Sequence, residues 1–503
     1  MLIAIHFARL GPYHLARLRS ACDVLIPMGW RVLALEIAGT DSTYEWEKEP
    51  VVSPGYERVT VFPDSVFETI PADQMKQGIG RELNRIRPDA MAIAGWGTSD
   101  ARACLDWCKS HGAMSIVMSE TRSADGRRVW WKEWLKSRIV RKYDAALCGG
   151  DSHKRYLVDL GIPAERIKYG YNVVDNSIFA EKRNRKWGTR NGECTEIEGV
   201  GLSVSKDTES IEVEGKVLSH GGTVITEQGD AEASLHLGAH AGASASGSLK
   251  SKLADLPVSE SLIRYADGPA SLPATSHSLP ATAPEALTGP YFLASNRFVE
   301  RKNLGTLIKA YALCVKSFEH EKEAWPLVLL GDGELRGELE ALCGELELKT
   351  VMGFSRGDAG TTEEGDLKLN YYKLKTSPGG RCVIFAGFRQ IGELPAFYGS
   401  AGAFIHPALS EPWGLVINEA MASGLPILSS DNVGAAEELV IDGETGYLFD
   451  PMDQQAISAA MQRISDMPED RRQQMGESAR ALVEEKAPLS GFGNGLKALL
   501  LQK

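Results

Sequence analysis

Two blocks of the sequence consist of short, almost continuously apolar runs that alternate with helix-length segments. A strand formed by such a run has no polar face, so it must be covered on both sides. Strands of this kind are typical of parallel sheets that carry helices on both faces. The pattern therefore predicts two doubly wound, Rossmann-like α/β domains. The expected strands cover residues 2–8, 31–38, 58–62, 90–95, 114–119 and 145–150 in the first block, and 291–295, 326–331, 383–388, 402–407 and 425–430 in the second.

Between the blocks, residues 188–287 are rich in Gly, Ala, Ser, Thr and Pro and poor in aromatic residues. Such a composition buries too little apolar surface to offset the entropy of ordering the chain, so we expect a disordered, low-complexity linker or insert. A second polar segment, 355–381, interrupts the C-terminal block and is expected to be an insertion. The predicted domains are then residues 1–187 and 288–490, followed by a C-terminal tail, 491–503.

Charge and cysteine usage exclude several classes of protein. The 503 residues carry a formal net charge of −12, which argues against general nucleic-acid binding because that needs a basic face. We expect neither a signal peptide nor a membrane span, because no apolar stretch approaches the roughly 20 residues that cross a bilayer. The eight cysteines are scattered without a Cys-x-x-Cys pair, which favours reduced thiols in a cytoplasmic protein over a disulfide framework or a zinc site.

Two carboxylates flank a tight turn in the stretch SEPWGLVINEAMASGLPIL, residues 410–428. Glu411 lies before the Pro-Trp-Gly turn, and Glu419 lies about one turn inside the helix expected after it. Gly414 and Leu415 would offer free N–H groups at the start of that helix, which is a natural phosphate site. A carboxylate beside a phosphate is useful if it accepts hydrogen bonds from sugar hydroxyls. Two unrelated surface glutamates are the alternative.

A second motif, SNRFVERKNL, follows the first expected strand of the C-terminal block. Arg297 and Lys302 would lie at the carboxyl end of a strand, where open α/β sheets bind ligands, and could neutralise a diphosphate without a metal. The chain has no Asp-x-Asp motif that would supply metal ligands. A solvated basic turn is the alternative. Gly331 and Gly333 follow another strand and could admit a nucleotide close to the backbone, although strand-GDG-helix turns also arise from packing.

Two further features lie in the N-terminal block. Gly11, in the turn after the first strand, could face a ligand between the domains, and His14 beside it is expected to be structural. Residues 126–142 carry seven Lys or Arg residues, one Glu and three Trp residues, with Trp130, Trp134 and Arg138 on one stripe of a helix. Such a helix could bind anionic lipid headgroups or an acidic acceptor. A core-packing helix with snorkelling cations is the alternative.

Taken together, these motifs resemble glycosyltransferase family 4, whose fold is GT-B: two Rossmann-like domains that face each other across a cleft. The resemblance covers roughly residues 1–187 and 288–490. It rests on EPWGLVINE followed by AMASGLPIL, and on SNRFVERKNL, LGDGEL, AGFRQIGELPAFYGSAGAFIHPALSEPWG and DGETGYLFDP.

The resemblance implies a hexosyltransferase (EC 2.4) that retains the anomeric configuration and needs neither a metal nor another cofactor. The nucleotide-diphosphate sugar would bind the C-terminal domain, and a glycan, lipid-linked or small-molecule acceptor would bind mainly the N-terminal domain. Carried over to this sequence, the site comprises Glu411 for the donor sugar, Glu419 for the ribose, Arg297 and Lys302 for the diphosphate with the backbone of Gly414 and Leu415, Phe388 to Leu394 for the base, and Gly11 near the diphosphate.

One departure from the family pattern concerns the N-terminal domain. Many members have a histidine after the fifth strand, whereas this chain has Ser119, Glu120 and Thr121 there. This departure and the two inserts make a catalytically inactive GT-B binding or scaffold protein one alternative. A GT-B sugar-nucleotide epimerase is a second, separate alternative. The sequence does not identify the donor base, the sugar, the acceptor or the oligomeric state.

Overall fold

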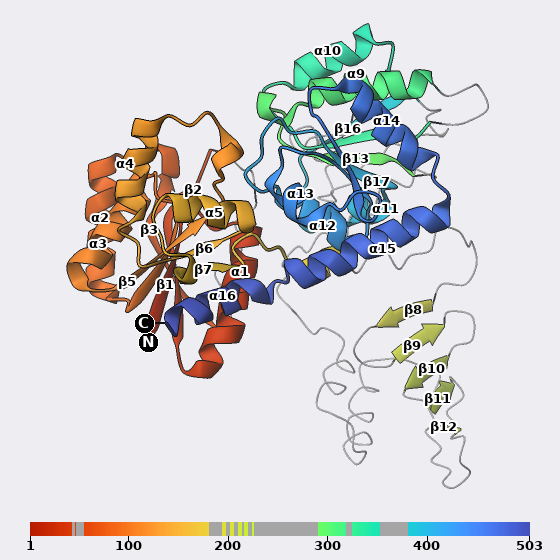
Figure 1. Cartoon of the computed structure of the whole chain (residues 1–503). Helices are drawn as coiled ribbons and strands as arrows, with labels where there is room; N and C mark the ends of the chain where they lie inside the picture. The colour runs from red at the N-terminus through yellow and green to blue at the C-terminus, as the bar shows by residue number, and fades with distance from the viewer. Residues whose placement is uncertain are drawn as a thin grey trace, which may run out of the picture. The chain divides into compact units, whose positions relative to one another are not determined.

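The computed structural model describes residues 1–42, 46, 55–180, 290–317, 324–352 and 381–502, together with the backbone of five strands between residues 194 and 225. The chain divides into two compact units, one formed by Met1–Asn184 with Pro280–Lys503 and the other by Arg185–Leu279. The larger unit contains two separate parallel sheets (Figure 1). We call the part around the first sheet, residues 1–180, the N-terminal lobe and the part around the second, residues 290–489, the C-terminal lobe.

The N-terminal lobe is built on a seven-stranded sheet of order β3-β2-β1-β4-β5-β6-β7, in which every neighbouring pair is parallel. The chain starts in the middle of the sheet and winds outward in both directions, which is the doubly wound topology. The strands are β1 (Leu2–Phe7), β2 (Arg31–Thr40), β3 (Tyr56–Val66), β4 (Ala90–Ala94), β5 (Met114–Ser119), β6 (Ala145–Cys148) and β7 (Ile167–Tyr169). The α-helices are α1 (Pro12–Leu25), α2 (Ala72–Ile86), α3 (Ser99–His111), α4 (Trp130–Val140), α5 (Asp151–Asp159) and α6 (Asn176–Ala180).

The C-terminal lobe repeats this plan with the order β15-β16-β14-β13-β17-β18-β19, again parallel throughout. The strands are β13 (Phe292–Ser295), β14 (Leu327–Leu330), β15 (Lys349–Met352), β16 (Cys382–Gly387), β17 (Ala403–His406), β18 (Ile427–Ser430) and β19 (Gly446–Phe449). The helices are the 3-10 turn η5 (Glu300–Lys302), α9 (Leu304–Lys316), α10 (Arg336–Glu345), α11 (Leu394–Ser400), α12 (Leu415–Ala422), α13 (Gly434–Leu439), α14 (Gln454–Ser465) and α15 (Glu469–Lys486).

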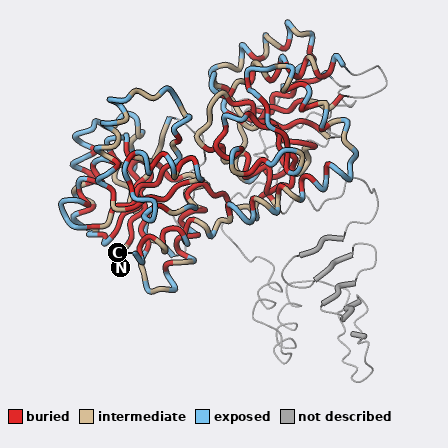
Figure 2. Tube along the Cα trace, in the orientation of Figure 1, coloured by how far each residue is buried: buried red, intermediate tan, exposed pale blue. Residues whose placement is uncertain are grey.

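Apolar side chains on both faces explain why these strands form parallel sheets. In β1, Ile3 and Ile5 enter one core cluster while Ala4 enters the cluster on the opposite face. In β17, Phe404 and Ile405 divide in the same way between the two clusters of the C-terminal lobe. Figure 2 shows the buried strands at the centre of each lobe. The prediction of two Rossmann-like, doubly wound α/β domains is therefore confirmed.

The end of the chain returns to the N-terminal lobe. Residues that the sequence suggested only as a tail form helix α16 (Ser490–Leu500), and Phe492, Leu496 and Leu499 are buried with Leu18 and Ile5 in one cluster. A side chain at position 493 or 495 would collide with main-chain oxygens of the N-terminal lobe, 2.3 and 2.4 Å from the added Cβ. The glycines of SGFGNGL thus permit a close contact between this helix and the N-terminal lobe.

The smaller unit contains a five-stranded antiparallel sheet of order β12-β11-β10-β9-β8. Its strands are β8 (Cys194–Ile197), β9 (Leu202–Ser205), β10 (Ser210–Val213), β11 (Lys216–Ser219) and β12 (Val224–Ile225). The first part of segment 188–287 therefore includes short strands. The rest of this segment lies outside the described residues, as does the predicted insertion 355–381 except for Arg381.

The cysteines and the helices can be compared with the expectation of reduced thiols and no membrane span. The seven cysteines whose side chains the structure describes are unpaired and buried. Burial raises the pKa of the Cys108 thiol to about 12, so this thiol is protonated and inert. Within the part of the chain that the structure describes, none of the helices combines the length and hydropathy needed to cross a lipid bilayer. The cytoplasmic location stays a prediction.

Candidate active site

The candidate site is built at the carboxyl ends of two neighbouring strands in the C-terminal lobe. Strand β13 leads into the segment that carries Arg297 and Lys302, and β17 leads into the loop that carries Glu411. The two strands pair directly, with Phe292 opposite Ala403, so the segments that follow them emerge at the same edge of the sheet. The topology thus brings together Lys302 and Glu411, which are 109 positions apart in the sequence.

Glu411 forms ion pairs with two neighbouring cations. Its Oε2 accepts a hydrogen bond from Nη1 of Arg301 at 2.8 Å and another from Nζ of Lys302. Lys302 is only 8% exposed, and this burial lowers its pKa, while the Glu411 carboxylate opposes the shift. The charge of Arg297 also lowers the pKa of Lys302, which places the two predicted cations in one electrostatic cluster. Glu411 thus pairs with two cations, Arg301 and Lys302, and the charge of Arg297 acts on Lys302. The motif SNRFVERKNL contains Arg301, but its role was not predicted.

The turn before α12 requires glycine at position 414. Gly414 has φ +98°, in the left-handed region, and is the N-cap of the helix. A Cβ there would lie 3.1 Å from Cγ1 of Val433 and 3.3 Å from Cγ of Glu411, so both conformation and space disfavour a larger residue. Leu415 is the first helical residue, and its N–H belongs to the first turn, which lacks intrahelical acceptors. The predicted helix N-terminus beside Glu411 is therefore present.

His406, the last residue of β17, was not predicted as a site residue. It is fully buried, and neither ring nitrogen has a hydrogen-bond partner among the described residues. Burial, reinforced by the charges of Lys302 and Arg301, holds its pKa well below the usual range, so the ring is neutral. A polar residue at the end of an otherwise apolar strand was the available sequence signal.

Glu419 is buried within α12 and contacts both lobes. Its Oε1 accepts a hydrogen bond from the Tyr13 hydroxyl at 2.6 Å, and its Oε2 accepts one from the Tyr398 hydroxyl at 2.7 Å. Burial raises the pKa of this carboxyl to about 7, and the two hydroxyls oppose that shift. Each carboxylate oxygen can accept a second hydrogen bond, so these contacts are compatible with the predicted ribose contact, which stays a prediction.

The glycines of LGDGEL are explained by packing against the 296–298 segment. A Cβ on Gly331 would lie 1.8 Å from the main-chain oxygen of Asn296, and one on Gly333 would lie 2.7 Å from that of Phe298. Both glycines have positive φ, +123° and +156°. They allow the end of β14 to approach the segment that carries Arg297. Their predicted proximity to a nucleotide is a separate matter and stays a prediction.

On the N-terminal lobe, Gly11 precedes α1 and its N–H donates to Nδ1 of His14 at 3.1 Å. Burial, together with the charges of Arg17 and Arg9, lowers the pKa of His14 to about 3. The imidazole is therefore neutral and caps the helix, which agrees with the expected structural role. The predicted role of Gly11 near a diphosphate stays a prediction.

The segment predicted to lie near a base begins at Phe388 and ends at Leu394. The ring of Phe388 contacts that of Trp46 edge-on, with 5.0 Å between ring centroids. Leu394 is the first residue of α11, and its side chain belongs to the core of the C-terminal lobe. Of the two ends of this segment, Phe388 and Leu394, only Phe388 has an aromatic side chain that could stack on a base.

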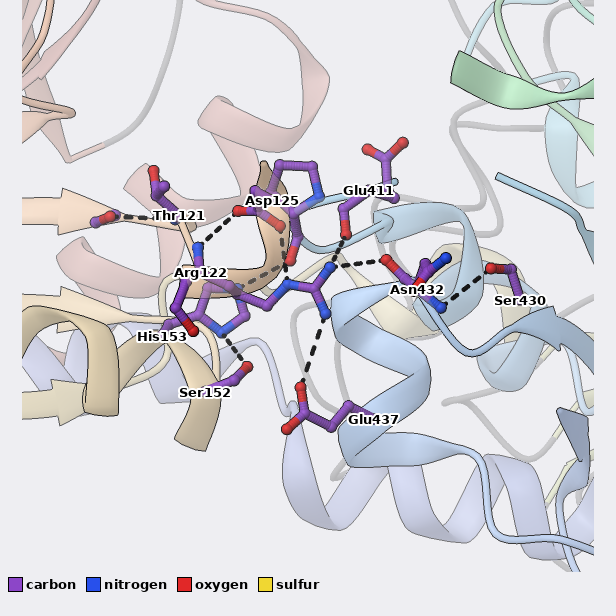
Figure 3. Close-up of polar contacts among 12 residues, drawn as sticks. Thr121, Arg122, Asp125, Ser152, His153, Glu411, Ser430, Asn432 and Glu437 are labelled. Atoms are coloured by element: carbon purple, nitrogen blue, oxygen red, sulfur yellow. Dashed lines mark hydrogen bonds and ion pairs between the residues drawn. The ribbon is translucent and has the colours of Figure 1, made fainter. Parts of the chain in front are cut away.

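Arg122, which follows β5, connects the N-terminal lobe to the Glu411 loop (Figure 3). Its Nη2 donates to the main-chain oxygens of Glu411, at 2.9 Å, and of Asn432, at 2.7 Å. Its Nε donates to Oδ1 of Asp125 at 3.0 Å, and only 3% of the residue is exposed. A buried, charge-paired guanidinium therefore holds the main chain that positions Glu411.

A second contact from the same lobe involves His153 of α5, also visible in Figure 3. Its Nε2 lies 2.9 Å from the main-chain oxygen of Pro412, so this nitrogen carries the donated proton. Burial lowers the pKa of His153, which is consistent with a neutral ring. Neither His153 nor Arg122 was predicted, because only the fold brings them to residues 411 and 412.

The three residues found in place of the family histidine have different environments. Ser119 is buried at the end of β5, and its Oγ accepts a hydrogen bond from the N–H of Thr121 at 3.2 Å. Glu120 between them is exposed to solvent. No group of three or more His, Cys, Asp or Glu residues is placed to hold a metal ion in the described ranges.

Comparisons with known proteins show that part of the chain is similar in sequence to glycosyltransferases. The sequence model of the family described as "Glycosyl transferases group 1" matches residues 359–482. Over 182 residues, 35% of the chain, the sequence is 32% identical to sucrose-phosphate synthase 4 of Arabidopsis thaliana. Over 125 residues, 24% of the chain, it is 34% identical to the sulfoquinovosyl transferase SQD2 of the same plant. These matches span only 15% and 23% of the two relatives.

Solved structures share the fold of the two lobes. HepE of Anabaena, in complex with UDP and glucose, matches with a TM-score of 0.56 at 13% identity, and the match covers 100% of both chains. Sucrose-phosphate synthase from Thermosynechococcus elongatus matches with a TM-score of 0.56 at 16% identity, over 100% of this chain and 98% of that one. The fold is thus GT-B, and part of the chain is similar in sequence to glycosyltransferases.

Proposed function

We propose that the protein transfers a hexose-type sugar from a nucleotide-diphosphate sugar to an acceptor hydroxyl, with retention of configuration and without a metal ion. The donor would bind the C-terminal lobe, and the acceptor would bind mainly the N-terminal lobe. Three observations support this proposal: the family match in the C-terminal lobe, the UDP-bound structures that share the fold, and the cation cluster around Glu411.

The proposed chemistry depends on stabilising the leaving group. Departure of the sugar from its diphosphate concentrates negative charge on the phosphate oxygens. Lys302 and Arg297 would neutralise that charge, and the first N–H groups of α12, at Gly414 and Leu415, would add fixed dipoles. Lys302 suits this task because its ammonium is already desolvated and placed, so little reorganisation is needed during the reaction.

The glutamates would position the donor rather than exchange protons. Glu411 would accept hydrogen bonds from the donor sugar, and its pairing with Lys302 fixes it next to the proposed diphosphate site. Glu419 would accept from the ribose through the lone pairs that Tyr13 and Tyr398 leave available. Holding the anomeric carbon in this way favours transfer by orientation.

The observation that carries the proposal is the ion pair of Lys302 with Glu411 beside the α12 N-terminus. The test is incubation of the purified chain with a panel of UDP-, GDP- and ADP-sugars and a panel of acceptors. Sugar transfer, with the donor's anomeric configuration in the product by NMR, is the expected result. Inverted product would contradict retention, nucleotide binding without turnover would favour the inactive binding protein, and conversion of one nucleotide sugar to its epimer would favour the epimerase.

A further inference from the structure

Helix α4 presents large apolar side chains to solvent. Trp130 is 82% exposed, Trp134 53%, Trp131 47% and Leu135 47%, while Val140 is the one buried residue of the helix. Contiguous apolar exposure of this kind marks an interaction site. The structure therefore contradicts the alternative in which the tryptophans pack in the core.

The exposed residues form one face of the helix. Positions 130, 131, 134, 135 and 138 fall within a sector of roughly 140° at 3.6 residues per turn. The opposite side is anchored to the lobe: Glu133 accepts hydrogen bonds from Lys136 at 2.8 Å and from the Tyr156 hydroxyl at 2.7 Å, and Ile139 packs against the core. The helix is thus held by its inner side and leaves the tryptophans facing outward.

The surroundings of this face are strongly basic. The guanidinium of Arg138 lies over the ring of Trp134 at 4.6 Å, and the ammonium of Lys132 lies 5.4 Å from that of Trp131. The exposed cations of the region are Arg127, Lys132, Arg138, Arg141 and Lys142. Glu133, the one acidic residue in 127–142, is engaged on the inner side. The whole chain has a net charge of −12, so this positive charge is confined to the region around α4 and does not reflect the composition of the whole protein.

We propose that the face formed by Trp130, Trp131, Trp134 and Leu135 docks on an anionic lipid membrane. Tryptophan is the residue that most favours the headgroup region, where its ring is apolar and its N–H remains hydrated. The adjacent cations would attract anionic headgroups, and each contributes to binding that salt weakens. A second copy of the chain is disfavoured, because apposed faces would bring the same cations together. This inference does not depend on the proposed glycosyl transfer.

The test is flotation of the full-length protein with vesicles of phosphatidylcholine alone and of an equal mixture of phosphatidylcholine and phosphatidylglycerol. Binding to the mixed vesicles and not to the neutral ones is expected. The double variant Trp130→Ser/Trp134→Ser should lower the partition coefficient by at least about tenfold. Lys132→Gln and Arg138→Gln should each lower it about fivefold and reduce its salt dependence.

Met452→Ser is the matched control, because Met452 is also an exposed apolar residue (71%) but lies in the C-terminal lobe. The Met452→Ser protein should bind the vesicles as the unmodified protein does. Equal binding to both vesicle types, no binding to either, or full binding by the tryptophan variant would overturn the proposal. So would a dimer in vesicle-free solution that the tryptophan variant abolishes. Melting temperatures check that each variant is folded. If the double variant is unfolded, the single variant Trp130→Ser replaces it in the flotation test.

Discussion

The guanidinium of Arg122 donates a hydrogen bond of 2.9 Å to the main-chain oxygen of Glu411, which lies 289 positions away in the other lobe. The same nitrogen also bonds the main-chain oxygen of Asn432. Glu411 and Val433 form an isolated parallel bridge, so Arg122 binds two segments that already pair with each other. The loop after β5 thereby fixes the position of the carboxylate proposed to bind the donor sugar.

Arg122→Met should therefore lower kcat by at least about tenfold, because the charge-assisted hydrogen bonds to the main-chain oxygens of Glu411 and of Asn432 in the paired segment are lost. The dissociation constant of the nucleoside diphosphate should change little, because the proposed diphosphate contacts remain. Arg122→Lys should restore part of kcat. Steady-state kinetics and calorimetric titration measure the two quantities.

Arg155→Ala is the matched control for that change. Arg155 also pairs across the lobes, with Glu437 at 2.9 Å, but its side chain is 70% exposed, whereas the longer pair of Glu437 with Arg122, 3.7 Å, involves a buried guanidinium. Its loss should leave kcat unchanged. A purely structural role for Arg122 would instead predict loss of nucleotide affinity and melting temperature in parallel with kcat, with no rescue by lysine.

Glu411→Gln should lower sugar transfer by at least about tenfold, because an amide is a weaker acceptor for sugar hydroxyls and leaves Lys302 without its ion-pair partner. The measurement is the initial transfer rate at saturating donor. Glu444→Gln, in a turn of the same lobe, is the control. Turnover like that of the unmodified protein in Glu411→Gln would contradict the site assignment.

Gly414→Ala should destabilise the protein more than Gly443→Ala does. Both glycines have positive φ, +98° and +74°, so alanine costs about 1–2 kcal/mol of conformational free energy at either position. An added Cβ at 414 also meets Val433 and Glu411, whereas at 443 it meets nothing within 4 Å. Urea unfolding measures both free energies. Equal losses would show that space at position 414 is not limiting.

Glu419 should make the unfolding free energy fall as pH rises from 4.5 to about 7. The carboxyl is protonated in both states below its ordinary pKa of 4.5, but above it the unfolded chain releases a proton that the folded chain retains up to about pH 7. The expected loss is on the order of 3 kcal/mol. Unfolding at several pH values, in the unmodified protein and in Glu419→Gln, measures it. The glutamine variant should lack this slope; identical slopes in the two proteins would refute the assignment.

The two-domain α/β fold could be predicted because its central strands are apolar on both faces, as in the run that became β16. Strands β7, β15 and β19 were not expected. All three lie at sheet edges. β7 (IKY) and β15 (KTVM) mix polar and apolar residues, Lys349 and Thr350 are exposed, and β19 (GYLF) is only four residues long. At an edge, pairing with one neighbour rather than burial defines the strand, so the local pattern is weak.

The candidate site was predictable where its residues share a local motif. Glu411, Gly414 and Glu419 lie within one turn and helix, and Lys302 follows a recognisable strand. The contacts of Arg122, His153 and Tyr13 with the C-terminal lobe were not predictable, because they join segments hundreds of residues apart. Such pairings depend on how the lobes pack, which no local pattern records.

Lys302 is proposed to hold a diphosphate beside Glu411. The most direct measurement compares the affinities of UDP, GDP and ADP with those of UMP, GMP and AMP, for the unmodified protein and for Lys302→Met. The unmodified protein should bind one diphosphate more tightly than its monophosphate, and the methionine variant should lose at least about tenfold of that preference while its affinity for the monophosphate hardly changes. An equal preference for diphosphate in the two proteins would contradict the claim.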